Sequence, residues 1–187
     1  QPASQHSHTR ASDPWVFRSV LDEKARMITL ALDSNLWVAY DAQYASLYKA
    51  WKGGVELDGA VYTYRHGPQP TSLGDPYFQA KEQEAWRIRK DDQLITPRVT
   101  YKGHRFDHGG VILSYDLSHD GHTIHVEEHP EYVRSENGDH AFERSFHIEG
   151  LPEGSELVLL RELESVCMNG IHTNAQFGTD RRAESGI

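Results

Sequence analysis

The stretch VILSYDLSHDGHTIHVEEHPEYV, residues 111–133, holds two runs of alternating residues on either side of a turn. Successive side chains of a strand point to opposite faces, so alternation predicts a half-buried strand. The apolar positions are Val111, Leu113, Tyr115 and Leu117, then Ile124 and Val126. Asp120-Gly121 is a typical hairpin turn. We therefore expect an antiparallel hairpin with one apolar and one polar face, and Ser114 near His125.

Runs of similar length recur along the chain, separated by Gly, Asp and Asn turns. The expected strands are Val16–Leu21, Arg26–Leu32, Leu36–Asp41, Leu47–Trp51, Ala60–Arg65, Arg98–Tyr101, Val111–Leu117, His122–Glu128, Phe142–Ile148 and Glu156–Arg161. Glu82–Arg89 fits a helix or a strand. Three prolines and two glycines in HGPQPTSLGDPYF, residues 66–78, predict one long irregular loop. The pattern predicts an all-β fold, an antiparallel β-sandwich with little helix.

Composition and charge argue against certain classes of partner, and they indicate how the chain is divided into segments. The 187 residues carry 19 basic and 28 acidic side chains, a net charge of −9, which argues against nucleic acid and anionic membranes as partners. No apolar run approaches the roughly 20 residues of a membrane-spanning helix. We expect a flexible segment over residues 1–12, a sandwich over 13–168 and a tail or linker over 169–187. The polar start, without Met, suggests that a secretory signal was removed.

The second strand of the opening stretch places histidines and acids on one face. Ligands two residues apart can chelate one ion, but three of them at i, i+2 and i+4 span roughly 13 Å, which is too far without a bulge or a residue from another strand. The candidate metal ligands are His125, Glu127, His129 and His147. Two alternatives remain open: the solvated face of an ordinary sheet, and a polar ligand surface without metal. The apolar row of Phe142–Ile148 is interrupted by Arg144.

Aromatic residues are concentrated between residues 36 and 78. Exposed Trp and Tyr rings stack on the apolar faces of sugar rings, whereas buried ones fill a core. The candidate ligand contacts are Trp37, Trp51, Tyr64, His66 and Tyr77.

Cys167 is the only cysteine, so no disulfide can form within the chain. With His172 it has ligand types of a blue-copper site. The alternatives are an unpaired thiol or half of a disulfide to another chain segment. No C-x-x-C-H motif for covalent haem attachment occurs, and neither does a G-x-S-x-G or Walker A motif.

Residues 13–78, and within them LYKAWKGGV (47–55) and HGPQPTS (66–72), resemble a non-haem domain of large secreted bacterial redox proteins. YKGHRFDHGGVILSYDL (101–117) and VEEHPEYVR (126–134) are similar to the same family. In those proteins the domain is joined to c-type cytochrome modules and sometimes to carbohydrate-binding modules. The resemblance implies a periplasmic or extracellular location beside electron carriers. It does not imply a known chemistry and identifies no catalytic residues in this sequence.

The sequence therefore predicts an accessory or binding domain of a secreted multidomain redox protein. Its expected ligand is a polysaccharide, and its expected partner is a c-type cytochrome module of the same chain or a separate electron carrier. It would support electron transfer in oxidative polysaccharide degradation. No cofactor is expected within this segment unless the histidines hold a metal ion. The alternatives are a metal-dependent redox or catalytic domain, and a structural spacer that docks a cytochrome.

Overall fold

The computed structural model describes residues 14–57, 68–134 and 140–160, and these residues form strands and turns without any helix. The predicted all-β, sandwich-like fold is thus confirmed. In this part of the chain there is accordingly no helix long and apolar enough to cross a membrane. The predicted terminal segments 1–12 and 169–187 and the predicted strand Ala60–Arg65 lie outside the described residues.

The described strands form three antiparallel sheets. Sheet A has the order β1-β2-β3-β4-β5, with bounds Trp15–Leu21, Lys24–Asp33, Leu36–Asp41, Ser46–Glu56 and Thr71–Gln79. Sheet B has the order β12-β6-β7, with bounds Glu156–Leu160, Ala85–Lys90 and Gln93–Ile95. Sheet C has the order β11-β10-β9-β8, with bounds His140–Glu149, His122–Arg134, Gly110–His119 and Arg98–Asp107.

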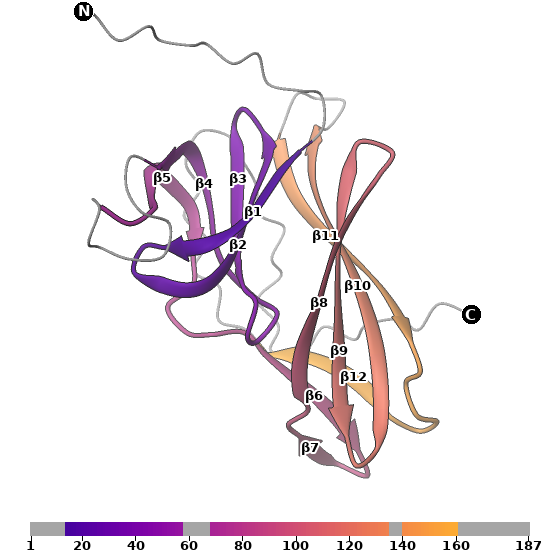
Figure 1. Cartoon of the computed structure of the whole chain (residues 1–187). Helices are drawn as coiled ribbons and strands as arrows, with labels where there is room; N and C mark the ends of the chain where they lie inside the picture. Colours follow the sequence, from indigo (N-terminus) through magenta and orange to yellow (C-terminus); the bar gives the residue numbers. More distant parts are fainter. Residues whose placement is uncertain (1–13, 58–67, 135–139, 161–187) are drawn as a thin grey trace, which may run out of the picture.

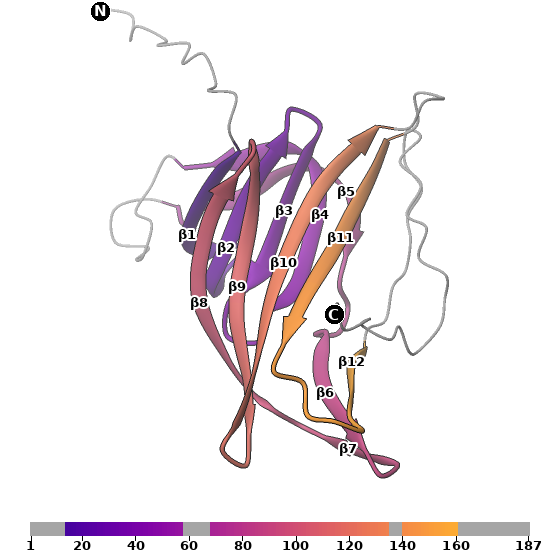
Figure 2. The ribbon, with the colours of Figure 1, turned by 90° about the vertical axis from the view of Figure 1, so that its right-hand side faces the viewer.

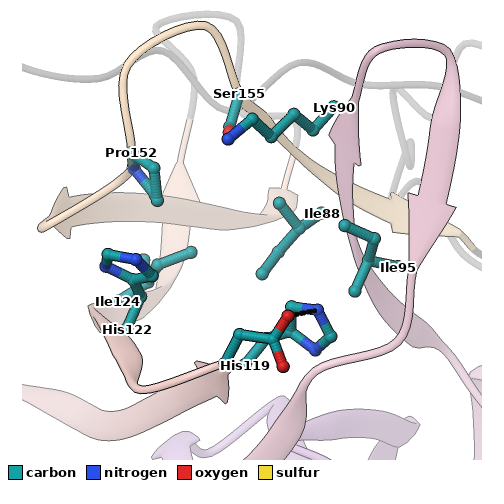
Figure 3. Close-up of a pocket in the computed structure, with 9 residues that line it drawn as sticks. Ile88, Lys90, Ile95, His119, His122, Ile124, Pro152 and Ser155 are labelled. Atoms are coloured by element: carbon teal, nitrogen blue, oxygen red, sulfur yellow. Dashed lines mark ion pairs between the residues drawn. The ribbon is translucent and has the colours of Figure 1, made fainter.

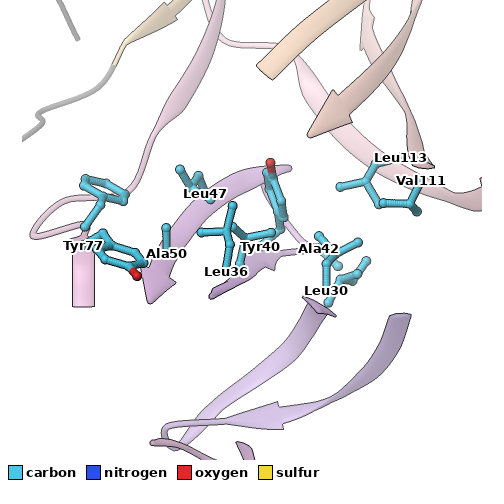
Figure 4. Close-up of a cluster of buried hydrophobic side chains, with 12 residues drawn as sticks. Leu30, Leu36, Tyr40, Ala42, Leu47, Ala50, Tyr77, Val111 and Leu113 are labelled. Atoms are coloured by element: carbon cyan, nitrogen blue, oxygen red, sulfur yellow. The ribbon is translucent and has the colours of Figure 1, made fainter. Parts of the chain in front are cut away.

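Sheet C forms one layer, and sheets A and B together form the other (Figures 1 and 2). Towards one end of sheet C, Val111 and Leu113 pack against the apolar face of sheet A (Figure 4). Towards the other end, Tyr115, Leu117, Ile124, Val126 and Ile148 pack against Trp86, Ile88 and Leu157 of sheet B. The inward-facing residues of the opening hairpin therefore serve two cores, one on each partner sheet.

Sheet A is curled, because the turn after β1 meets the beginning of β5. The backbone N–H of Asp22 donates to the Pro70 carbonyl at 3.1 Å, and its carboxylate accepts from the Ser72 N–H at 2.7 Å. The two edge strands of the sheet thus approach each other at one end (Figure 1). The face inside this curl, here called the concave face, has its own core of Leu21, Met27, Ala39 and Trp51, all with no exposed surface.

Two sequence-based expectations for residues 66–95 are corrected. Thr71–Gln79 is the strand β5 and not an irregular loop. Its proline is tolerated because β5 is an edge strand and Pro76 lies beside a register shift, where the ladder does not need its missing N–H. The segment that fitted a helix or a strand is the strand β6, followed by a short strand β7 that the sequence did not indicate.

The register of the opening hairpin also differs from expectation. The Asp120-Gly121 turn pairs His119 with His122, and this pairing sets Asp116 opposite His125. Ser114 lies opposite Glu127, two residue pairs further from the turn than the partner of His125. The polar partner of His125 is therefore a carboxylate and not a hydroxyl.

Candidate functional site

A buried polar network lies where the three sheets meet. The Glu128 carboxylate accepts hydrogen bonds from Tyr40 at 2.7 Å, from Tyr115 at 3.1 Å and from Nε of Arg144 at 2.6 Å. Arg144 Nη1 also donates to Glu84 at 2.7 Å. Glu84 belongs to the link between β5 and β6 and accepts from the Leu47 N–H of sheet A at 2.8 Å. One guanidinium thereby joins sheet C to sheet A and to the link into sheet B.

The electrostatics of this network favour a structural role. Burial opposes the charge of Arg144, but the carboxylates of Glu128 and Glu84 outweigh it and raise the Arg144 pKa well above its usual value. Burial, reinforced by the negative charge of Glu128, raises the pKa of Tyr40 and Tyr115, so both phenols stay protonated and donate. All three charged side chains are at most 6% exposed, which keeps them from ligands in solution.

Aromatic residues form a row across the concave face of sheet A. The register aligns Trp15 with Ala31, Ala31 with Trp37, and Trp37 with Trp51. Trp51 is fully buried, and its ring stacks on Trp37 with centroids 6.2 Å apart and planes 29° apart. Trp37 is half-buried, and Trp15 is 45% exposed. The row therefore runs from a buried anchor on β4 to an open indole on the edge strand β1.

A polar cluster occupies the same concave face at the end where the sheet curls. The Asp22 carboxylate accepts from the Ser72 hydroxyl at 2.7 Å and from Tyr48 at 3.1 Å, and the Lys49 ammonium lies 3.6 Å from it. Lys49 also donates to the Ser72 hydroxyl at 2.6 Å. Burial would raise the Asp22 pKa, but the Ser72 hydrogen bonds, Lys49 and Tyr48 together lower it below 3.8.

The lowered Asp22 pKa predicts a dependence of stability on pH. A carboxyl whose pKa is lower in the folded state stabilises the fold above its unfolded pKa of 3.8, and this contribution disappears as pH falls through the folded value. The difference in unfolding free energy between wild type and Asp22→Asn should thus be larger at pH 7 than at pH 2.5. Urea unfolding at both pH values measures it. Asn at the exposed Asp75 is the control and should show a smaller change, and an equal change would contradict this account.

Three histidines of β10 and β11 lie on the outward face of sheet C, each beside a carboxylate. His125 Nδ1 is 2.6 Å from Asp116, His129 Nε2 is 3.6 Å from Glu131, and His147 Nε2 is 3.1 Å from Glu149. Glu127 instead accepts from Arg105 at 2.8 Å. Within residues 14–57, 68–134 and 140–160, no three His, Cys, Asp or Glu side chains are grouped so that they could hold a metal ion. The four predicted metal ligands are thus on one face, but they are not brought together.

The predicted ligand contacts on sheet A differ in how much of their side chains is exposed. Trp37 is the one that keeps an open surface. Trp51 has none, and Tyr77 is 5% exposed with its hydroxyl donating to the Asn35 carbonyl, so neither presents a ring to a sugar in this conformation. Both rings pack inside the protein, which agrees with the alternative that these aromatic residues fill a core. Tyr64, His66, Cys167 and His172 lie outside the described residues.

A small pocket lies at the far end of the molecule, between sheet B and the turn of the β9–β10 hairpin (Figure 3). Its volume is about 210 Å³. Ile88, Ile95 and Ile124 form the apolar wall, and Pro152 lies at one side. The polar groups at its edge are Lys90, His119, Asp120, His122 and Ser155. No sequence pattern indicates that these residues, from the strands β6, β7, β9 and β10 and two connecting segments, lie together.

Sequence reasoning missed Glu84, Glu128 and Trp15. Glu128 follows Ile124 and Val126 at the same two-residue spacing, so its position on the inward face could be read from the alternation. Arg144 breaks an apolar row in the same way. Two opposite charges in two inward rows were therefore the available signal for a buried ion pair.

Comparisons with known proteins find nothing similar to this chain. No protein-family model, no curated protein and no solved structure matches the chain. The geometry of the concave face, the pocket and the outward face of sheet C is therefore the basis for assigning a function.

Proposed function

We propose that this chain is a binding domain for a neutral polysaccharide, which stacks on Trp15 and Trp37. The observation that carries the proposal is the indole row of the concave face. Trp15 and Trp37 stand on β1 and β3, two strand spacings apart, which is roughly 10 Å. Trp37 is held in place by the buried Trp51 behind it. Aromatic rings fixed on strands of one sheet provide contact area at a low entropic cost.

The charge of the chain favours a neutral ligand over an acidic one. The net charge of −9 repels polyanions such as pectins. The concave face also offers hydroxyl, carboxylate and ammonium groups in the cluster of Asp22, Tyr48, Lys49 and Ser72. The Asp22 and Lys49 side chains keep 17% and 10% of their surface exposed, and through it they can hydrogen-bond to a sugar hydroxyl without requiring a net charge on the ligand.

The resemblance of residues 13–78 supports a further part of the proposal. In this account the domain works in the periplasm or outside the cell, beside a c-type cytochrome module of the same chain or a separate electron carrier. By holding the polysaccharide it would keep the redox module near its substrate, since linking two binding events raises the effective concentration of the second.

Removing the open indole should weaken binding with little effect on the fold. We expect Trp15→Ala to lower the affinity for a bound polysaccharide at least about tenfold, equivalent to about 1.4 kcal/mol. The loss is expected because the ring provides a stacking surface and, at 45% exposed, contributes little to the core. Electrophoresis through gels containing soluble β-glucan, xylan or galactomannan measures the affinity from the retardation of the protein.

Tyr44→Ala is the matched control. Tyr44 is 42% exposed and lies in the turn between β3 and β4, away from the indole row. It should leave the retardation unchanged. Equal losses for the two variants would contradict the assignment of the site. If wild type is not retarded by any of the three glycans, the spacer alternative becomes the better account.

A further inference from the structure

We propose that the pocket between sheet B and the β9–β10 hairpin binds a small aliphatic carboxylate. The pocket is remote from the concave face, so this inference does not depend on the polysaccharide proposal. Its two ends differ chemically. Lys90 and Ser155 lie together at one end, and His119, which is paired with Asp120, lies at the other, with the isoleucines between them (Figure 3).

The end near Lys90 and Ser155 is suited to an oxygen acceptor. The Ser155 hydroxyl oxygen is buried and has no hydrogen-bond partner in the described part of the chain. A buried polar group without a partner is unfavourable, and a ligand that supplies one removes that cost. Lys90 brings a positive charge to the same end. A carboxylate can accept from Lys90, and from Ser155 as well once the serine side chain turns its buried hydroxyl into the pocket.

The rest of the pocket is suited to an alkyl chain. Ile88 and Ile124 are buried and Ile95 is half-buried, and the three side chains face the same space (Figure 3). A polyol would have to place several hydroxyls against these side chains without hydrogen bonds, which is costly. The volume of about 210 Å³ is below the range of roughly 300–1,000 Å³ found for drug-sized ligands. The ligand is therefore a chain of a few carbons.

The Asp120 carboxylate at the other end of the pocket does not repel this ligand appreciably. Asp120 is 84% exposed, and His119 Nε2 lies 3.2 Å from its carboxylate. A carboxylate in water is strongly screened from a charge across the pocket. The head group of the ligand thus binds at the Lys90 end, and its tail points towards His119.

The test is a titration of the full chain with straight-chain carboxylates from acetate to octanoate, followed by NMR of the isoleucine methyl groups. We expect the signals of Ile88, Ile95 and Ile124 to move. Affinity should rise roughly fourfold for each added methylene until the pocket is full, and then level off. Affinity that does not depend on chain length would overturn the proposal, as would equal binding of the primary alcohol of the same length.

Two pairs of variants locate the binding. Lys90→Gln should weaken the best carboxylate roughly tenfold and leave the corresponding alcohol unaffected, with the exposed Lys52→Gln on β4 as its control. Ile95→Trp should fill the pocket and abolish the methyl shifts of Ile88 and Ile124. Leu94→Trp is its control, because Leu94 is 50% exposed and does not line the pocket. Unchanged binding in Lys90→Gln, which alters an exposed side chain and should fold normally, would overturn the assignment.

Discussion

Replacing Arg144 with methionine is expected to lower the free energy of unfolding by about 3–5 kcal/mol. The methionine fills a similar volume but leaves Glu84 and Glu128 buried without their shared cation. Removing one partner of a buried pair costs more than the pair contributes, because the remaining charge has lost its solvation. Urea unfolding monitored by tryptophan fluorescence measures the change from the transition midpoint and slope.

Arg105→Met is the matched control for this prediction. Arg105 donates to Glu127 at 2.8 Å, and Glu127 is the sequence neighbour of Glu128 on the opposite face of β10. The Arg105 side chain is 50% exposed, so this pair should contribute only about 0–1 kcal/mol. A similar loss in both variants would show that burial does not decide the energetics of these pairs, and would contradict this interpretation of the network.

Gly53→Ala is expected to lower the free energy of unfolding by about 2–6 kcal/mol, the sum of a backbone strain and an overpacking contribution. Gly53 has φ +145°, and a Cβ there would lie 2.0 Å from the Leu73 carbonyl oxygen. Its partner Gly74 on β5 is equally restricted, since a Cβ would lie 2.1 Å from the Lys52 carbonyl oxygen. The two strands therefore approach so closely that neither position accepts a side chain. Thermal and urea unfolding measure the loss.

The neighbouring glycine provides the control. A Cβ at Gly54 meets nothing within 4 Å, and Gly54 does not share the positive φ of Gly53. Gly54→Ala should thus be close to neutral, or slightly stabilising through the lower entropy of the unfolded chain. If Gly54→Ala destabilises as much as Gly53→Ala, the effect does not come from the close approach of β4 and β5.

The sequence predicted the strands well where alternation is regular. Ile124 and Val126 define β10, and both are buried as expected. The prediction of a loop at β5 is wrong because proline and glycine also occur in strands of this kind: an edge strand tolerates Pro76, and the close approach of β4 and β5 requires Gly74. Composition alone does not distinguish a loop from an edge strand of this kind.

The candidate site was less accessible to sequence reasoning than the fold. Alternation places Glu128 on an inward face, but the pairing with Arg144 and Glu84 depends on the register of two strands and on the path of the β5–β6 link. Trp15 and Trp37 are 22 positions apart in the sequence and become neighbours in a row only through Ala31 on β2. The histidine-rich strand β10, by contrast, is conspicuous in the sequence, yet His125 and His129 each lie beside a single carboxylate, and His122 lies at the pocket.

The most direct test of the polysaccharide site uses the indole N–H signals of the four tryptophans. A neutral oligosaccharide of a glycan that retards the protein is titrated into labelled protein, and each signal is assigned by substitution. We predict saturable shifts for Trp15 and Trp37. The Trp86 signal should stay in place, because this ring is buried in the core between sheets B and C and its N–H donates to the Ala45 carbonyl. Shifts of Trp86 without those of Trp15 and Trp37, or no saturable shift at all, would contradict the account.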